Sequence, residues 1–135
     1  MSDATVDLLS RYYAAFNAQD METFLSLLTE DVVHDINQGS RETGKQAFVD
    51  FMARMNRCYR EQIVDLVVMS NTTGTRASAE FTVLGTYLAT DEGLPDACGQ
   101  TYRLPAGAFF EIRDGKVARV TNYYNLQDWL RQVGA

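Results

Sequence analysis

The hydrophobic pattern of this chain changes its period near Arg60, and this change limits the folds that are open to it. Before Arg60 the apolar residues recur every three or four positions, as they do on amphipathic helices. After Arg60 apolar and polar residues alternate, and β-branched and aromatic residues are frequent, which is typical of strands. A run of helices followed by a run of strands predicts an α+β fold, with the helices packed on one face of an antiparallel sheet.

The helical half divides into three predicted helices. The first covers residues 3–18 and presents a wide apolar face. Asp20 can cap a second, short helix that ends at 29–31. A polar loop is expected at 40–42, and the segment 43–46 then fits a capping box at the start of the third helix.

The alternating pattern of the second half predicts four strands that are separated by polar turns. They lie at about 62–70, 76–90, 100–113 and 116–124. The Asp114-Gly115 pair between the last two strands favours a two-residue type I′ hairpin, and Asn125 can cap a short C-terminal helix. With three N-terminal helices on one face, a curved antiparallel or mixed sheet closes partway into a cone and leaves a pocket between helices and sheet.

Size and charge exclude several classes of protein. The 135 residues suffice for one core, so we expect a single domain over 1–135. The net charge of −6, without a cluster of Lys and Arg, argues against a nucleic-acid partner. No apolar run approaches the roughly 20 residues that span a bilayer, so we expect no membrane partner and a cytoplasmic location. Cys58 and Cys98 lie far apart in a chain with one histidine, and we expect neither a metal nor a cofactor.

The stretch 32–39 is the clearest candidate for chemistry. It holds the single histidine, His34, beside Asp35 in an apolar run that ends in a turn. His34 titrates near working pH when unperturbed, and Asp35 could abstract a proton next to a carbonyl if burial raised its pKa. Alternatively, Asp35 starts an Asx turn and His34 is a hydrogen-bonded core residue. Because neighbouring strand residues point to opposite faces, a regular strand places only one of the two in a pocket, and parity with Ile36 favours His34.

Three segments carry a resemblance to a known family. They are Arg-Tyr-Tyr-Ala-Ala-Phe-Asn-Ala-Gln-Asp at 11–20, Leu-Thr-Glu-Asp-Val-Val-His-Asp at 28–35, and Gly44 at the start of a helix. In these segments the chain resembles the ketosteroid-isomerase-like and SnoaL-like members of the nuclear transport factor 2-like superfamily. The resemblance implies the cone-shaped fold and a homodimer formed through the sheet face. It leaves the activity open, because the superfamily includes isomerases, cyclases, dehydratases, hydrolases, ligand binders and assembly domains.

The resemblance also implies roles for individual residues. The isomerases use a tyrosine on the first helix, an aspartate base at the end of the first strand and a protonated acid in the sheet. Tyr12 matches the tyrosine without a gap, although a tyrosine on an apolar helix face can also be plain core. Asp35 matches the base if one residue is deleted between Asp31 and Asp35, whereas without a gap the position falls on Ile36 and the base is absent. Of these alternatives we favour Asp35 and expect it to face the pocket. The third acid is missing, since Ala108 or Gly107 takes its place.

Other residues are candidates for the wall of the pocket. Asn122 interrupts the apolar face of the last strand, and a polar side chain there needs a partner inside the cavity. The residues expected to bind substrate are Asn122, Tyr124, Tyr87, Phe51, Met55 and Trp129. Tyr87 and Phe109 would also suit a contact between subunits.

These observations leave three functions open. The first is a small-molecule enzyme of the isomerase, lyase or cyclase type, in which Asp35 or His34 transfers a proton on a hydrophobic carbonyl compound with help from Tyr12. The second is a non-catalytic domain that binds an apolar ligand in the same cone. The third is a dimerisation module whose exposed sheet face is its function.

Overall fold

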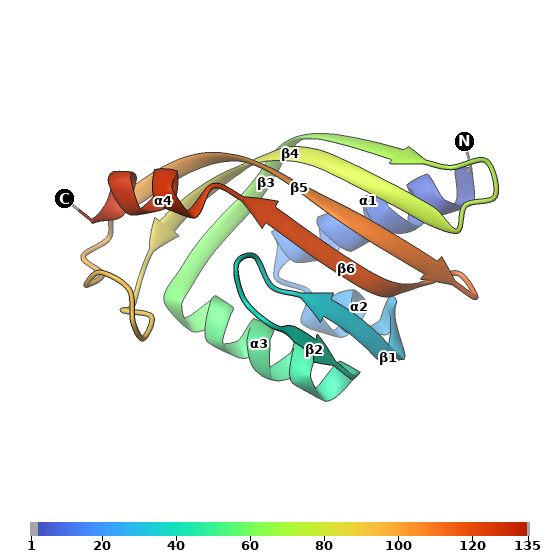
Figure 1. Cartoon of the computed structure of the whole chain (residues 1–135), viewed down its shortest axis with the longest axis horizontal. Coiled ribbons are helices and arrows are strands. Elements are labelled where there is room, and N and C mark those ends of the chain that lie inside the picture. The colour runs from blue at the N-terminus through green and yellow to red at the C-terminus, as the bar shows by residue number, and fades with distance from the viewer. Residues whose placement is uncertain (1–2, 135) are drawn as a thin grey trace.

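The computed structural model describes residues 3–134, in which three helices pack on one face of a six-stranded sheet and a fourth follows the last strand (Figure 1). The elements in chain order are α1 (Asp3–Ala18), α2 (Met21–Ser26), β1 (Leu28–Asp35), β2 (Arg41–Thr43), α3 (Lys45–Cys58), β3 (Tyr59–Ser70), β4 (Arg76–Tyr87), β5 (Thr101–Arg113), β6 (Lys116–Tyr124) and α4 (Leu126–Val133). The predicted α+β class, with its short C-terminal helix, is confirmed.

The sheet has the strand order β2-β1-β6-β5-β4-β3. Strand β1 runs parallel to β6, and every other neighbouring pair in this sheet is antiparallel. The long strands β3, β4 and β5 curve over α1, and β1 with β2 lies on the other side of β6 (Figure 1). The parallel pairing therefore brings the first strand beside the last one, and it sets the first half of the chain against the end of the sheet.

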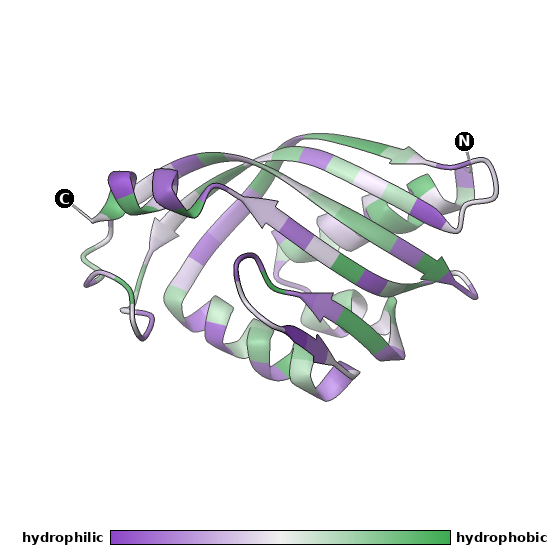
Figure 2. Cartoon of the chain, in the orientation of Figure 1, coloured by the Kyte–Doolittle hydropathy of each residue, from purple (hydrophilic) through white to green (hydrophobic). Residues whose placement is uncertain are grey.

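The core lies between the helices and the inner face of the sheet. Hydrophobic and hydrophilic residues alternate along β6, as Figure 2 shows, and this alternation gives the sheet one apolar face. Leu9 of α1, Phe110 of β5 and Val120 of β6 are fully buried there. Burial of a side chain of this size stabilises the fold by roughly 1.5–3 kcal/mol.

The second helix is shorter than its sequence pattern predicts. Asp20 caps α2 as expected, because its Oδ1 accepts a hydrogen bond from the backbone N–H of Thr23 at 3.2 Å. The helix ends at Ser26, however, and Leu28 already pairs with Val117 of β6. The prediction that the helix includes Leu28 and is ended by 29–31 is wrong, because sheet pairing with a distant strand outweighs the helical spacing of a short apolar run.

The start of α3 also differs from the prediction. Gly44 is the N-cap residue, with φ of 103°, and no side chain caps this end of the helix. Thr43 belongs instead to β2 and pairs with Val33, so the predicted capping box and the predicted loop at 40–42 are both wrong. A glycine fits this position because its φ lies in the left-handed region that other residues rarely adopt.

The turn and cap at the end of the sheet follow the prediction. Asp114 and Gly115 both have positive φ, 54° and 71°, as a type I′ turn requires. Asn125 caps α4 by accepting a hydrogen bond from the backbone N–H of Asp128 at 3.1 Å. None of the helices within residues 3–134 is long and apolar enough to cross a membrane.

Candidate active site

A cavity of about 380 Å³ lies between the helices and the sheet. Its wall is mainly aromatic and aliphatic, and this size and lining suit a small organic ligand. Among the residues selected from the sequence, those that line it are Tyr12, His34, Phe51, Met55, Asn122, Tyr124 and Trp129. The structure thus brings together side chains from α1, β1, α3, β6 and α4, although it does not test their roles.

His34 is the buried ionisable group of the pair on β1. It pairs with Val120 of β6 and is 2% exposed. Its ring stacks on Phe48, with ring centroids 4.4 Å apart, and lies nearly perpendicular to the ring of Phe51, with centroids 4.6 Å apart. Burial lowers the pKa of His34 to about 4, and the nearby Asp35 opposes this shift. The imidazole is therefore neutral at pH 7, and it can accept a proton or donate a hydrogen bond.

Asn122 is the polar partner of His34. Its Nδ2 lies 3.4 Å from His34 Nε2, at the long end of hydrogen-bond range; an amide nitrogen only donates, so Nε2 accepts and the proton of the neutral imidazole sits on Nδ1. Nδ1 of His34 is buried and has no hydrogen-bond partner among residues 3–134. A loosely bonded imidazole in an apolar wall is a suitable place for a ligand oxygen or an acidic C–H group.

Tyr12 lies in the same cavity on α1, 5% exposed. Its ring packs 4.5 Å from that of Phe24, which in turn lies 5.9 Å from Phe48, so aromatic contacts connect it to the His34 stack. Burial raises the pKa of Tyr12 well above its ordinary value, so the hydroxyl keeps its proton. That hydroxyl makes no hydrogen bond with any residue in the described part of the chain, and it can donate one to a ligand.

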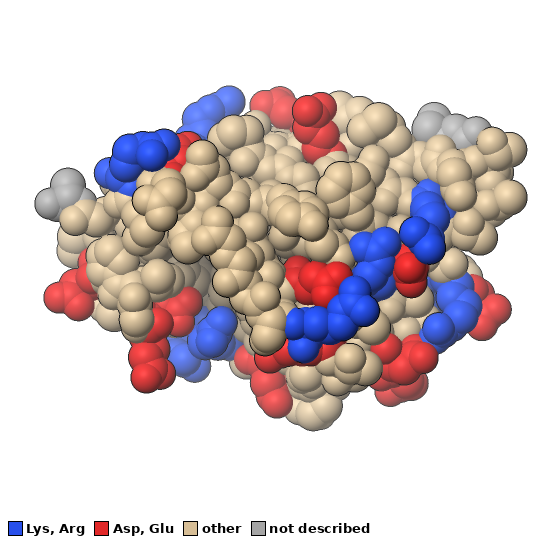
Figure 3. Space-filling model, viewed as in Figure 1, with Lys and Arg blue, Asp and Glu red and all other residues tan. Residues whose placement is uncertain are grey.

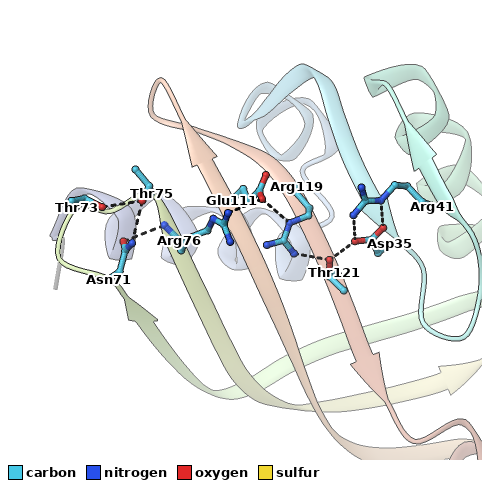
Figure 4. Close-up of polar contacts among 9 residues, drawn as sticks. All are labelled: Asp35, Arg41, Asn71, Thr73, Thr75, Arg76, Glu111, Arg119 and Thr121. Atoms are coloured by element: carbon cyan, nitrogen blue, oxygen red, sulfur yellow. Dashed lines mark hydrogen bonds and ion pairs between the residues drawn. The ribbon is translucent and has the colours of Figure 1, made fainter.

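Asp35 faces away from the cavity. Its Oδ1 accepts a hydrogen bond from Nε of Arg41 at 2.6 Å, and its Oδ2 accepts one from the hydroxyl of Thr121 at 2.5 Å (Figure 4). These bonds, with that of Arg41 first, lower the pKa of Asp35 to about 2. The expectation that Asp35 faces the pocket is therefore wrong.

The regular geometry of β1 explains this orientation. Val32 and His34 are buried, whereas the residues between and after them are only half-buried. The register of β1 against β6 does shift, but only between Leu28 and Val33, upstream of the pair. Without a bulge at Asp35, strand alternation sends the two neighbours to opposite faces.

A ladder of charged and hydroxyl groups extends from Asp35 across the outer face. Arg119 donates a hydrogen bond to Thr121 at 2.7 Å and lies 3.5 Å from Glu111, which pairs with Arg76 at 3.2 Å (Figure 4). Basic side chains form a diagonal band on this face of the molecule, with acidic side chains beside them (Figure 3). Asp35 is thus one member of a surface network, and each such exposed pair contributes little stability, about 0–1 kcal/mol.

Tyr87 is part of the core and not of the cavity wall. It is fully buried, its hydroxyl donates to the carbonyl of Pro95 at 2.6 Å, and it accepts from the backbone N–H of Asp91 at 3.0 Å. The segment 91–99 folds over this ring, and both suggested roles for Tyr87, substrate contact and subunit contact, are therefore wrong. Phe109, the other candidate for a subunit contact, is 52% exposed.

Three acidic residues of the cavity wall, Glu61, Asp91 and Glu92, were not predicted from the sequence. Glu61 lies on β3 and accepts a hydrogen bond from the hydroxyl of Tyr102 at 2.5 Å. Asp91 accepts one from Tyr59 at 2.8 Å and lies 3.7 Å from Nε of Arg54. The predicted strand began at residue 62, so Glu61 fell outside it. No cluster of three or more His, Cys, Asp or Glu side chains within residues 3–134 has the arrangement of a metal site.

The family follows from comparison with known proteins. Residues 9–120 match the SnoaL-like domain. The chain therefore belongs to the SnoaL-like family. It shares its fold with a nuclear transport factor 2-like protein from Burkholderia xenovorans LB400 that is 14% identical, with a TM-score of 0.76 over 98% of each chain. No curated protein sequence matches the chain.

Solved structures agree with this assignment. A candidate polyketide cyclase from Pseudomonas putida KT2440 is 66% identical with a TM-score of 0.95, over 98% of this chain and 99% of that one. A candidate polyketide cyclase from Xanthomonas campestris pv. campestris is 57% identical with a TM-score of 0.93, over 96% of each chain. TerC, which was crystallised with polyporic acid, is 16% identical with a TM-score of 0.77, over 98% and 100%, and shows the shared fold alone.

Proposed function

We propose that this protein is a small-molecule enzyme of the cyclase or isomerase type, which moves a proton at a carbon next to the carbonyl group of an apolar ketone. The observation that carries the proposal is a neutral, buried imidazole, His34, that faces a cavity of about 380 Å³ beside Asn122. The similarity to candidate polyketide cyclases supports the same class of reaction. In this proposal His34 takes the role that the sequence had favoured for Asp35.

The chemistry requires a base and a donor to the carbonyl oxygen. Nε2 of neutral His34 exchanges its long contact with Asn122 for the ligand and takes a proton from the carbon next to the carbonyl, and the electron pair of the broken C–H bond forms the C=C bond of an enolate. The protonated hydroxyl of Tyr12 donates a hydrogen bond to the enolate oxygen, where negative charge develops in a site shielded from water. The amide of Asn122 orients the imidazole.

The enolate then has two outcomes. In an isomerase, the imidazolium of His34 returns the proton to another carbon of the conjugated system. In a cyclase, the enolate carbon forms a bond to a second carbonyl carbon of the same ligand, and the oxygen of that carbonyl takes the proton from the imidazolium. Both routes leave His34 neutral again, so the enzyme is ready for the next molecule.

Hydrogen–deuterium exchange tests the proton-transfer step without knowledge of the natural substrate. The probe is 2-tetralone, a bicyclic ketone with acidic C–H groups beside its carbonyl, in D₂O at neutral pD, followed by NMR. We expect the protein to accelerate exchange, His34→Gln to reduce the acceleration about 100-fold or more, and Tyr12→Phe to reduce it at least about tenfold.

Asp35→Asn is the matched control, because it changes the neighbouring carboxylate on the outer face. Its exchange rate should stay within about threefold of that of the unmodified protein. Unchanged exchange in His34→Gln, or a loss in Asp35→Asn as large as that in His34→Gln, would contradict the assignment of His34 as the base.

Ligand binding without turnover is the second candidate function. One observation favours it, namely that a pKa of about 4 makes His34 a weak base at neutral pH. Binding of 2-tetralone without any acceleration of exchange above that of the solvent would support this alternative and exclude the catalytic one for this class of ketone.

We also propose that two copies of the chain associate through the outer face of the sheet. Phe109 and Tyr123 are 52% and 57% exposed, and their rings pack 5.9 Å apart on neighbouring strands. The ladder from Arg76 to Arg41 beside them contains both signs of charge, so it can meet a second copy of itself. The cytoplasmic location and the absence of nucleic-acid and membrane partners stay predictions.

A further inference from the structure

The cavity has a second polar end, toward the opposite edge of the sheet from His34. Glu61 lies on β3 and His34 on β1, and β6, β5 and β4 stand between these strands in the sheet. Because the sheet curves around the helices (Figure 1), both side chains nevertheless line one cavity. We propose that Glu61 binds a hydroxyl group at the end of the ligand remote from its reactive carbonyl. The inference rests on the proposed function, in which the carbonyl lies at the His34 end.

Three strands cooperate to hold Glu61 in place. Glu61 pairs with Gly85 of β4, and Gly85 pairs with Tyr102 of β5, so the three residues form one row across the sheet. Tyr102 lies over Gly85 and donates its hydroxyl to Oε2 of Glu61 at 2.5 Å. A Cβ atom on Gly85 would come within 2.2 Å of the Tyr102 ring. The missing side chain of Gly85 therefore makes the Tyr102–Glu61 bond possible.

Only one of the two carboxylate oxygens of Glu61 is engaged. Oε1 makes no hydrogen bond with any residue between Asp3 and Gly134, and the side chain is half-buried in the cavity wall. Burial raises the pKa of Glu61, while the hydroxyl of Tyr102 opposes this shift. An acceptor with poor access to water gains most from a donor on the ligand, because an unpaired polar group in such a site is costly.

The neighbouring carboxylate does not offer the same opportunity. Oδ2 of Asp91 accepts the hydroxyl of Tyr59, and its Oδ1 faces Arg54 at 3.7 Å. Arg54 and Asp91 line the same cavity as Glu61, and Tyr59 precedes Glu61 by two residues on the same face of β3. Arg54 offsets the charge of Asp91, and a hydroxyl loses less hydration than an ammonium group on entering the cavity, so a neutral donor suits Glu61 best.

A pair of ketones tests this inference by affinity alone. 2-Tetralone and 6-hydroxy-2-tetralone differ by one hydroxyl group, which lies at the opposite end of the two rings from the carbonyl. Trp129 is the only tryptophan of the chain and lines the cavity, so its fluorescence reports occupancy for both compounds. We expect the protein to bind the hydroxylated ketone about tenfold more tightly, as a hydrogen bond to a charged acceptor allows.

Two variants assign this preference to Glu61. Glu61→Met keeps the length of the side chain and removes the acceptor, so the two ketones should bind with equal affinity. Tyr102→Phe also removes the hydrogen bond between Tyr102 and Glu61, but it keeps the carboxylate and the strand pairing that positions it. The tenfold preference should therefore persist in this variant. If Glu61→Met fails to give a folded circular dichroism spectrum, Glu61→Gln replaces it, and its preference should fall to about threefold or less.

The possible results separate the two proposals. Equal affinity of both ketones for the unmodified protein, or a preference that persists in Glu61→Met, overturns the inference about Glu61 and leaves ketone binding at His34 intact. A preference that disappears equally in Tyr102→Phe overturns it as well, because the pair then acts only as a structural unit. Failure of either ketone to bind overturns the proposed ligand class together with this inference.

Discussion

His34 and Asp35 are adjacent in the sequence, yet they face opposite sides of the sheet and experience opposite environments. The pKa of each lies below its ordinary value, about 4 for His34 and about 2 for Asp35, but the causes differ. Burial disfavours the charged imidazolium of His34, whereas Arg41 and Thr121 favour the charged carboxylate of Asp35. At neutral pH the inner face therefore presents an uncharged base and the outer face a charged ion pair.

The difference shows how one strand separates chemistry from surface structure. The inner residue has rings on two sides and a single long contact to Asn122, so it retains capacity to bind or exchange a proton. The outer residue has both carboxylate oxygens occupied by donors. A carboxylate held in this way is a poor base, which is a further reason to assign proton transfer to the imidazole.

Replacing an aromatic residue by alanine should produce the largest difference in unfolding free energy between the two faces of the sheet. Phe48 is 2% exposed and packs against His34, so Phe48→Ala should lower the free energy of unfolding by about 3–5 kcal/mol through the cavity that it leaves. Phe109→Ala, on the outer face, should cost less than about 1 kcal/mol. Urea denaturation measures both values. Similar losses in the two variants would mean that the faces do not differ in packing as described.

A pH titration of stability tests the inner environment of His34. Its pKa is about 4 in the folded protein and 6.5 in its ordinary state, so between these values the unfolded chain binds a proton that the folded protein does not. Stability should therefore fall as the pH drops from 6.5 to 4, by about 3 kcal/mol from this group alone.

His34→Leu isolates this contribution from those of the carboxylates. The difference in unfolding free energy between the two proteins should be constant above pH 7 and change by about 3 kcal/mol in favour of the variant by pH 4. Parallel stability curves for the two proteins would contradict a buried, neutral His34.

The smallest effect on stability is expected on the outer face, where the measured quantity is association. Replacing both Phe109 and Tyr123 by serine should shift a dimer toward monomer in analytical ultracentrifugation and change the unfolding of the monomer by less than about 1 kcal/mol. A protein that is monomeric at every concentration before substitution would contradict the proposed dimer.

Local signals in the sequence were sufficient for several elements. The spacing of apolar residues predicts α1 at 3–18, where it is found, and the Asp114-Gly115 pair predicts the last turn. These features depend on residues that are close in sequence, so no tertiary information is needed. The start of β1 at Leu28 was not predictable in this way, because its partner Val117 is far along the chain.

In the candidate site, too, some features had local signals in the sequence and others depended on distant residues. Alternation alone indicates that one of His34 and Asp35 faces inward, and parity with Ile36 favours His34, but the alignment with the isomerases pointed to Asp35. Glu61 could have been found by extending the alternation of β3 by one residue, since Tyr59 and Ile63 on either side are buried. The bond from Tyr102 to Glu61 had no local signal, because it depends on the register of three strands.

The sequence by itself determined the class of fold, the family and the His34-Asp35 pair as the candidate site. Periodicity, turn residues and family segments are properties of short stretches of sequence, so they need no tertiary information. The tertiary structure decided which neighbour faces the cavity and which residues share it. The pairing of β1 with β6 places His34 beside Val120 on the inside and Asp35 beside Thr121 on the outside. Burial and ion pairing then follow from position in the sheet, and these set the charge of each group.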